Sequence, residues 1–139
     1  MTKATSFAND VIDHYVDNAA SGTKTIGPTT YTMPFKLRFL STLSTASAAG
    51  TEWSGGSYPA NGVSLAGLVA TAASAASKAN TGAITVTNAP ATTWADNEQV
   101  DSTGTPKRMV FKGTPSLAKT VNSGDTCTIG IGSATWTEV

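Results

Sequence analysis

In Thr51-Glu52-Trp53-Ser54-Gly55-Gly56-Ser57-Tyr58-Pro59-Ala60, two adjacent glycines lie between two aromatic residues. Glycine takes positive φ without steric cost, so Gly55 and Gly56 allow the backbone to reverse sharply. Trp53 and Tyr58 flank the reversal, and each has a large apolar face and one polar atom that needs a partner. The stretch therefore predicts a structural turn that joins two strands.

The residues on both sides of this turn alternate between apolar and polar side chains. Such alternation, with a period of two, is typical of strands. Residues 31–39 give the clearest example, and turn residues separate the later runs; one of these turns is Asn122-Ser123-Gly124-Asp125. The alternating apolar residues are Met33, Phe35, Leu37 and Phe39; Val63 and Leu65; Ile84 and Val86; Met109 and Phe111; and Cys127, Ile129 and Ile131.

Several short strands separated by turn signals indicate a mainly β protein. We expect an antiparallel β-sandwich, jelly-roll-like, in a single domain that spans residues 1–139. Residues 31–139 would form the sandwich, and residues 1–30 a helical N-terminal arm and a loop.

Residues 5–17 have the spacing of an amphipathic helix that Thr5 or Ser6 would cap. At about three turns the helix is too short to be stable alone, so its apolar face must dock on the domain or on a neighbouring subunit. Asn18–Thr30, with two glycines and a proline, is predicted to be a loop. The apolar face consists of Phe7, Val11, Ile12, Tyr15 and Val16.

The segment Leu68–Asn80 is ambiguous, because alanine favours helices while the spacing of large apolar residues is not helical. We interpret it as a strand end followed by an irregular loop, with a short helix as the alternative.

The composition favours association with other proteins over binding to nucleic acid. Charged residues make up 13% of the chain, and nine basic residues balance nine acidic ones. Contacts with nucleic acid phosphates need a basic stripe, and the nearest approach to one is a set of basic residues on two predicted strands. A protein without net charge tends to associate, so a homo-oligomer is expected. The basic set is Lys36, Arg38, Lys107, Arg108 and Lys112.

The sequence predicts assembly in a cytoplasm. Cys127 is the only cysteine, so no intrachain disulfide can form. No signal peptide and no apolar run of membrane-spanning length is apparent.

Few residues could carry out catalysis or hold a cofactor. His14 is the only histidine, and Cys127 alternates with isoleucines, which is typical of a buried thiol. Asp96, Glu98 and Asp101 suggest an acidic loop, but the spacing fits neither a calcium loop nor a glycosidase carboxylate pair. We therefore expect neither an enzyme nor a bound cofactor or metal.

One alternative to a purely structural role remains open. Trp94, next to Asp96 and Glu98, could form a platform on which a sugar stacks. The other interpretation is that the three tryptophans belong to the core or to a subunit contact, where aromatic residues are enriched.

The stretch Thr51–Tyr58 resembles the T-E-x-S-G-G-x-Y motif of a family of small structural proteins of tailed bacteriophages. Leu117–Thr126 is similar to the P-K-T-V-x-x-G-D-T motif of that family, which opens its last strand. The helix Phe7–Val16 and the strand Phe35–Leu43 occur in the same order in the family. Members are tail fibre, minor capsid or decoration-type proteins of the virion.

The resemblance implies a structural component of a phage particle, assembled in the bacterial cytoplasm. The expected partner is the major capsid protein or another virion protein, and a decoration protein suits 139 residues better than a fibre. The alternative is a tail fibre or appendage subunit that binds a host receptor or a glycan. Neither role involves nucleic acid or membrane. The expected interface residues are Phe7, Val11, Ile12 and Tyr15 on the helix and Trp53 and Tyr58 beside the turn.

Overall fold

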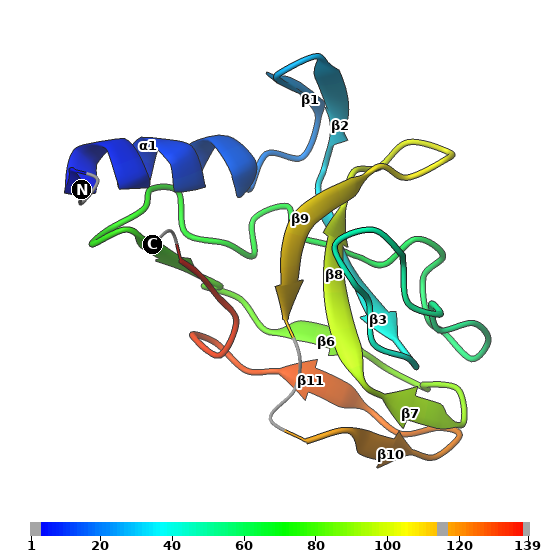
Figure 1. Ribbon diagram of the computed structural model, residues 1–139. Coiled ribbons are helices and arrows are strands. Elements are labelled where there is room, and N and C mark those ends of the chain that lie inside the picture. Colours follow the sequence, from blue (N-terminus) through cyan, green and yellow to red (C-terminus); the bar gives the residue numbers. More distant parts are fainter. Residues whose placement is uncertain (1–3, 114–116, 138–139) are drawn as a thin grey trace.

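The computed structural model describes residues 4–113 and 117–137, which form one short helix and several antiparallel strand pairs (Figure 1). The mainly β fold predicted from the alternation is confirmed as an antiparallel β-sandwich with an N-terminal helix. The elements are α1 (Thr5–Tyr15), β1 (Gly22–Ile26), β2 (Thr29–Met33), β3 (Lys36–Leu40), β4 (Val63–Ser64), β5 (Ser77–Ala79), β6 (Ile84–Val86), β7 (Thr92–Trp94), β8 (Asp96–Val100), β9 (Arg108–Gly113), β10 (Lys119–Val121), β11 (Cys127–Ile129) and β12 (Thr135–Thr137).

The first layer is a four-stranded antiparallel sheet in the order β4-β3-β8-β9. β3 and β8 pair along their whole length, so that Arg38 lies directly opposite Glu98. The pairing of β8 with β9 shifts in register between Glu98 and Val100. β9 confirms the strand predicted around Met109 and Phe111, whose side chains lie outside the described ones.

The second layer is a long two-stranded ribbon made of three short pairs, β5 with β12, β6 with β11, and β7 with β10. The pairs β6–β11 and β7–β10 follow one another along the lower part of the molecule in Figure 1. One side of the ribbon runs forward through β5, β6 and β7, and the other runs back through β10, β11 and β12. We call this element the ribbon.

Hydrogen bonds bridge the two gaps between these pairs. At the first gap, buried Asn80 accepts the amide of Ala134 through its side chain and donates to the carbonyls of Gly82 and Gly130, at 2.8 and 2.9 Å. At the second gap, Ala89 and Asp125 are linked through the backbone at 2.8 Å. The ribbon therefore continues across both gaps, although the regular ladder is interrupted.

The core lies between the two layers. Alternation places apolar side chains on the inner face of each layer, and burying them provides the main stabilising free energy of such a fold. The predicted inward positions are confirmed for Phe35, Leu37, Phe39, Ile84, Val86 and Cys127, which are all buried.

Helix α1 docks on the core through Ile12, and Val16, which directly follows the helix, is fully buried as well. Polar side chains from both layers accompany this apolar contact. Gln99 of β8 donates to the carbonyl of Tyr15 at 2.8 Å, and buried Lys78 of β5 donates to the carbonyl of Val16 at 2.5 Å. Carbonyls at a helix C-terminus have no partner within the helix, so these two side chains satisfy them.

Two predictions for the N-terminal part need correction. The residue at the N-cap of α1 is Ala4, and neither Thr5 nor Ser6 caps the helix. The predicted loop Asn18–Thr30 contains β1 and the start of β2, joined by a tight turn at Gly27-Pro28. β-branched threonines favour this hairpin, whereas the prediction gave more weight to the glycines and the proline.

The run predicted as one strand over residues 31–39 is two strands, because β2 ends at Met33 and β3 begins at Lys36. Pro34 between them has no amide hydrogen to donate to a ladder. Leu68–Asn80 contains no helix, as predicted. It contains the short strand β5 and an isolated bridge between Val69 and Asn80. No helix in the described residues has the length and apolar character that a membrane span requires.

Candidate functional site

The glycine turn joins the two layers of the sandwich. Gly55 and Gly56 have φ of 95° and 58°, which confirms the predicted reversal. The turn lies against the second gap of the ribbon, where the amide of Ser57 donates to the carbonyl of Asn88 at 2.9 Å. A Cβ at Gly56 would lie 2.2 Å from that carbonyl oxygen, so only glycine fits there.

The turn Asn122–Asp125 reaches the same gap from the other side. The amide of Gly124, which has φ of 92°, donates to the carbonyl of Ala89 at 2.9 Å, and the amide of Ala89 donates to the carbonyl of Asp125. The two motifs singled out in the sequence are about 70 residues apart, yet both contact Asn88-Ala89. They therefore build one structural joint, which we call the layer joint.

Four aromatic rings pack beside the layer joint. Phe39 of β3 lies between two tryptophans, with ring centroids 5.1 Å from Trp53 and 5.0 Å from Trp94. Trp53 and Tyr58 also contact each other edge to face at 5.9 Å. Trp53 and Tyr58 are 3% and 9% exposed, which corrects the prediction that they lie at a subunit contact.

The polar atoms of these aromatic residues are satisfied inside the fold. The indole of Trp53 donates to the carbonyl of Thr93 at 2.9 Å. The hydroxyl of Tyr58 accepts the amide of Phe39 at 3.1 Å and donates to Glu52 at 3.0 Å. Burial, together with the charge of Glu52, raises the pKa of Tyr58 well above its usual value.

The predicted acidic loop is in fact the central strand β8. All five of its residues, Asp96–Val100, are buried, although four of them are polar. The prediction failed because the strand has polar side chains on both faces, so that no apolar alternation marks it. A buried polar group needs a hydrogen-bonding partner, and each of these side chains has one outside β8.

Asp96 holds the loop that follows β3. Its carboxylate accepts the amide and the hydroxyl of Ser44, at 2.9 and 2.7 Å. On the next residue, the side-chain amide nitrogen of Asn97 donates to the carbonyl of Arg38 at 3.1 Å, and the side-chain oxygen of Asn97 accepts the indole of Trp94 at 3.0 Å.

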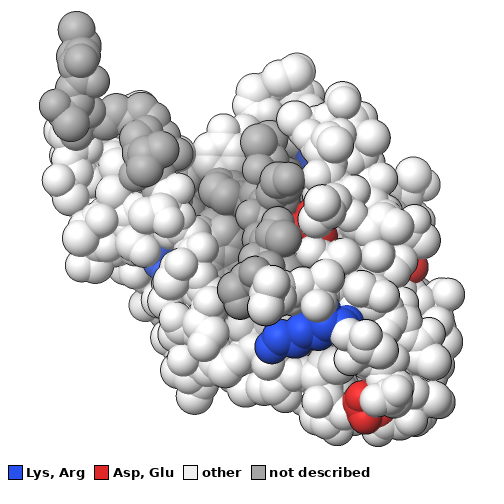
Figure 2. Space-filling view, turned by 60° about the horizontal axis from the view of Figure 1, so that its bottom comes forward, with Lys and Arg blue, Asp and Glu red and all other residues white. Residues whose placement is uncertain are grey.

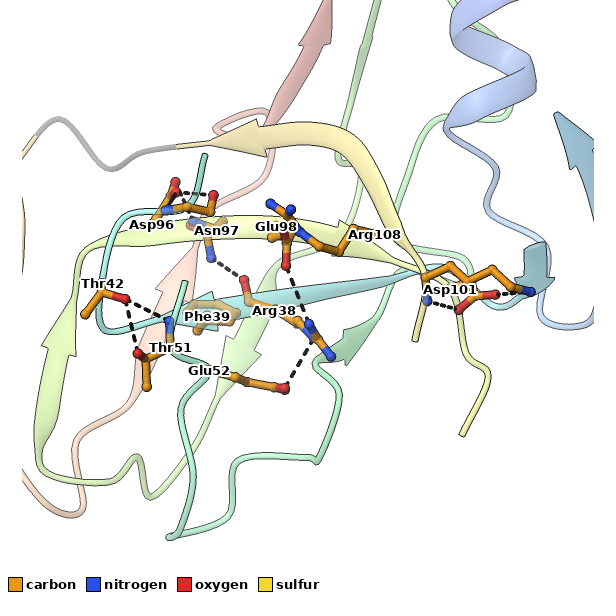
Figure 3. Close-up of polar contacts among 12 residues, drawn as sticks. Arg38, Phe39, Thr42, Thr51, Glu52, Asp96, Asn97, Glu98, Asp101 and Arg108 are labelled. Atoms are coloured by element: carbon orange, nitrogen blue, oxygen red, sulfur yellow. Dashed lines mark hydrogen bonds and ion pairs between the residues drawn. The ribbon is translucent and has the colours of Figure 1, made fainter. Parts of the chain in front are cut away.

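Glu98 is the centre of a network of charges on the outer face of the first layer (Figure 3). Its carboxylate is 1% exposed and pairs with Arg108 and, at 3.5 Å, with Arg38. Arg38 also pairs with Glu52 at 3.2 Å, and Arg108 donates to the carbonyl of Thr45 at 2.7 Å. The network therefore ties the segment 45–52 to β3, β8 and β9. Arg38 and Arg108, which belong to the basic set considered for nucleic acid binding, thus form ion pairs within the protein.

Asp101 ends β8 and fixes the N-terminal hairpin. Its fully buried carboxylate accepts the amides of Lys107 at 2.7 Å and Thr32 at 3.1 Å, and the hydroxyl of Thr103 at 2.7 Å. Burial alone would raise the pKa of Asp101, but the hydrogen bonds from Lys107, Thr103 and Thr32 outweigh it and hold this pKa below its usual value.

These positions correct the predicted ligand platform. Trp94, Asp96 and Glu98 are 8%, 0% and 1% exposed, and their polar atoms serve the fold. A sugar could stack on Trp94 only after the core had opened.

The predicted helical interface is divided between the core and the surface. Ile12 is fully buried in the domain itself, and Val11 and Tyr15 are half-buried. Phe7, in the first turn of α1, is 56% exposed. Of the four residues predicted to anchor the chain, Phe7 is the one that remains largely available for a partner.

The outer face of the ribbon consists largely of threonines. They alternate with the buried residues of the ribbon strands and pair across it, as in Thr85 and Thr128, whose hydroxyl oxygens are 3.1 Å apart. Figure 2 shows this side of the molecule with few charged side chains. The outward threonines are Thr85, Thr87, Thr93, Thr120, Thr126, Thr128, Thr135 and Thr137. We call this surface the threonine face.

The remaining candidate residues have structural surroundings. His14 is exposed, and its ring contacts the carbonyl of Thr25 at 3.1 Å. Cys127 is buried as predicted, and burial, with the nearby charge of Asp125, raises the pKa of its thiol. The described residues contain no cluster of three or more His, Cys, Asp or Glu side chains that could hold a metal ion.

The sequence contains a signal for the threonine face that is separate from the alternation of apolar residues. The pattern Thr-x-Thr recurs at 85–87, 126–128 and 135–137, always with a buried residue in the middle. Threonine is β-branched and favours strands, so this pattern predicts strands with a neutral outer face.

Comparison with known proteins gave no relative: no protein-family model, no curated protein and no solved structure matches the chain.

Proposed function

We propose that the chain is a structural component of a tailed bacteriophage particle, in which many copies decorate the capsid by binding the major capsid protein. The observation that carries the proposal is the layer joint. Two stretches resemble motifs of phage structural proteins, residues 51–58 and 117–126. Both form backbone hydrogen bonds with Asn88-Ala89. The two motifs are far apart in the sequence but build the same joint. The resemblance therefore concerns the residues that hold the two layers together, which supports the proposal.

The surface supports a role in binding proteins. Threonine carries a methyl group and a hydroxyl on a stiff side chain, so it loses little side-chain entropy in an interface and can donate and accept hydrogen bonds. Charged residues are depleted in the centre of protein interfaces, and the threonine face has few of them (Figure 2). Exposed Phe7 on helix α1 offers a further apolar contact.

Decoration would depend on the number of copies. A single face of neutral residues gives a weak contact, but copies on a symmetric lattice can also contact one another, and the weak contacts add. In this proposal the chain is assembled onto the particle in the cytoplasm of the host.

The alternative role, a tail fibre or appendage subunit that binds a host receptor or a glycan, has lost its proposed platform. Trp94, Asp96 and Glu98 are buried, so a glycan site would need other residues. This role therefore remains the second outcome of the test.

The test is the copy number of the chain in purified particles, measured by quantitative mass spectrometry against the major capsid protein. A decoration protein should be present in a fixed ratio of the order of one copy per capsid subunit or per capsomer. A few copies per particle would favour the appendage, and absence from the particles would overturn both roles.

A further inference from the structure

We propose that β11 is a pairing edge, at which a second copy of this chain adds its own β11 in antiparallel orientation to form a two-fold symmetric dimer. The proposal concerns the chain itself and goes beyond the role in a particle, which would stand if the dimer did not form.

The first observation is that β11 has a strand on one side only. Among the described strands it pairs with β6 alone, so every second amide and carbonyl group along its other side faces away from the ribbon. No hydrogen bond within the described residues occupies those groups in Cys127–Ile129. Unpaired groups in a strand edge are a template for another strand.

The second observation is that this edge lacks the usual protection. Proteins prevent pairing at an edge with charged residues, proline or a bulge. Thr126-Cys127-Thr128-Ile129-Gly130-Ile131-Gly132 contains no charged residue and no proline. Two residues beyond the strand, Ile131 is 69% exposed, so an apolar side chain is available close to this strand in the sequence.

Other outer strands are less suitable. β1, β5, β9 and β10 each contain lysine or arginine, and β4 has two residues. The neutral strands β2 and β7 are held by other segments, since Thr32 bonds to Asp101 and Ser102, and the carbonyl of Thr93 accepts the indole of Trp53. β6 is as neutral as β11, but it packs against β4 of the first layer, while β11 makes its main contact with β6. β12 is followed directly by Glu138 in the sequence. β11 is therefore a neutral edge whose outward residue, Thr128, is exposed.

A second copy fits this edge because the strand is compatible with itself. In antiparallel pairing of two identical strands, the residues around the two-fold axis meet their own copies. A charged residue there would meet a like charge, whereas threonine pairs favourably with threonine across strands. The pair Thr85–Thr128 already shows this contact within the chain, at 3.1 Å.

The experiment uses the full chain and a pair of matched variants. Thr128→Lys places a charge at the proposed edge, and Thr93→Lys places the same charge on an equally exposed threonine of β7, on the other side of the ribbon. Sedimentation velocity over a wide range of protein concentration gives the dimer dissociation constant of each. Circular dichroism checks that each variant is folded.

We expect the unmodified chain to form dimers, Thr128→Lys to weaken the dimer at least about tenfold because like charges oppose each other across the axis, and Thr93→Lys to leave it within about twofold. Hydrogen exchange should slow at residues 127–129 as the protein concentration rises. If Thr128→Lys does not fold, Ile131→Asp serves as the second variant, since Ile131 is largely exposed.

A chain that stays monomeric at the highest concentration, a dimer that both lysine variants weaken equally, or one that neither weakens would overturn the proposal. Open-ended fibres would do so as well, since a two-fold contact closes after two copies.

Discussion

Gly56 and Asn88 are in direct backbone contact across the two layers of the sandwich. The carbonyl oxygen of Asn88 occupies the space of a Cβ at Gly56, at 2.2 Å, and accepts the amide of the next residue, Ser57, at 2.9 Å. Asn88 itself has φ of 46°, and its side chain donates to the hydroxyl of Ser57. The glycine turn is thus the place where the two layers are fixed to each other.

Gly56→Ala should destabilise the fold by about 3 kcal/mol or more, because the new Cβ must displace the Asn88 carbonyl and break the hydrogen bond with Ser57. The matched control is Gly27→Ala. Gly27 has almost the same φ, 59° against 58°, but a Cβ there meets nothing within 4 Å. Its cost should be the backbone strain alone, about 1 kcal/mol. Urea unfolding of the two variants measures the difference, and equal losses would show that the layer joint contributes nothing.

Glu98→Gln should lower the free energy of unfolding by about 2–4 kcal/mol, because it leaves two arginines without their buried carboxylate. Asp17→Asn, which removes the partner of Lys24 in a more exposed pair, should cost about 1 kcal/mol or less. Chemical denaturation at neutral pH measures both. A Glu98→Gln variant as stable as the unmodified chain would mean that the charge network does not hold the segment 45–52.

Trp94→Ala should destabilise the protein by about 3–5 kcal/mol, as expected for a large side chain removed from a core. Trp94→Phe keeps most of the packing but loses the hydrogen bond to Asn97, so its cost should be nearer 1–2 kcal/mol. Thermal unfolding distinguishes the two. An alanine variant that keeps full stability would contradict the assignment of Trp94 to the core.

Asp101 should make the stability of the protein sensitive to acid. The pKa of Asp101 is lower in the folded protein than in the unfolded chain, so its contribution to stability is present above the unfolded value of about 3.9 and is lost as the pH falls through the folded pKa. Asp101→Asn should therefore lose stability at pH 7 and lose less on further acidification than the unmodified chain does. Urea midpoints at pH 7 and pH 3 measure this. Parallel pH profiles would contradict the role of the carboxylate.

The parts of the fold that depend on alternation were predictable from the sequence. Phe35, Leu37, Phe39, Ile84 and Val86 are buried as their spacing indicates, because a strand with one face in the core must alternate. The glycine turn was predictable as a turn, since two adjacent glycines favour a reversal. Its partner, Asn88, was not, because a contact between residues more than 30 positions apart leaves no local pattern.

The candidate site was the part that the sequence misrepresented. Asp96, Glu98 and Asp101 looked like an exposed loop, because their partners Ser44, Arg38 and Thr32 are far away in the sequence. A polar strand can be buried only when such partners exist, and they become visible only in the folded chain. Trp53, predicted at a subunit contact, and Trp94, proposed as a platform for a sugar, both lie in the core, because their packing partners also lie far away in the sequence.

The central claim is that this chain decorates the capsid of a phage particle, and the location of the chain in intact particles tests it most directly. Cryo-electron microscopy of purified virions, with symmetric and asymmetric reconstruction, would reveal that location. We predict density for the sandwich at symmetry-related positions over the capsid lattice. Density confined to the tail or to a single vertex, or no density in particles that contain all other structural proteins, would contradict the claim.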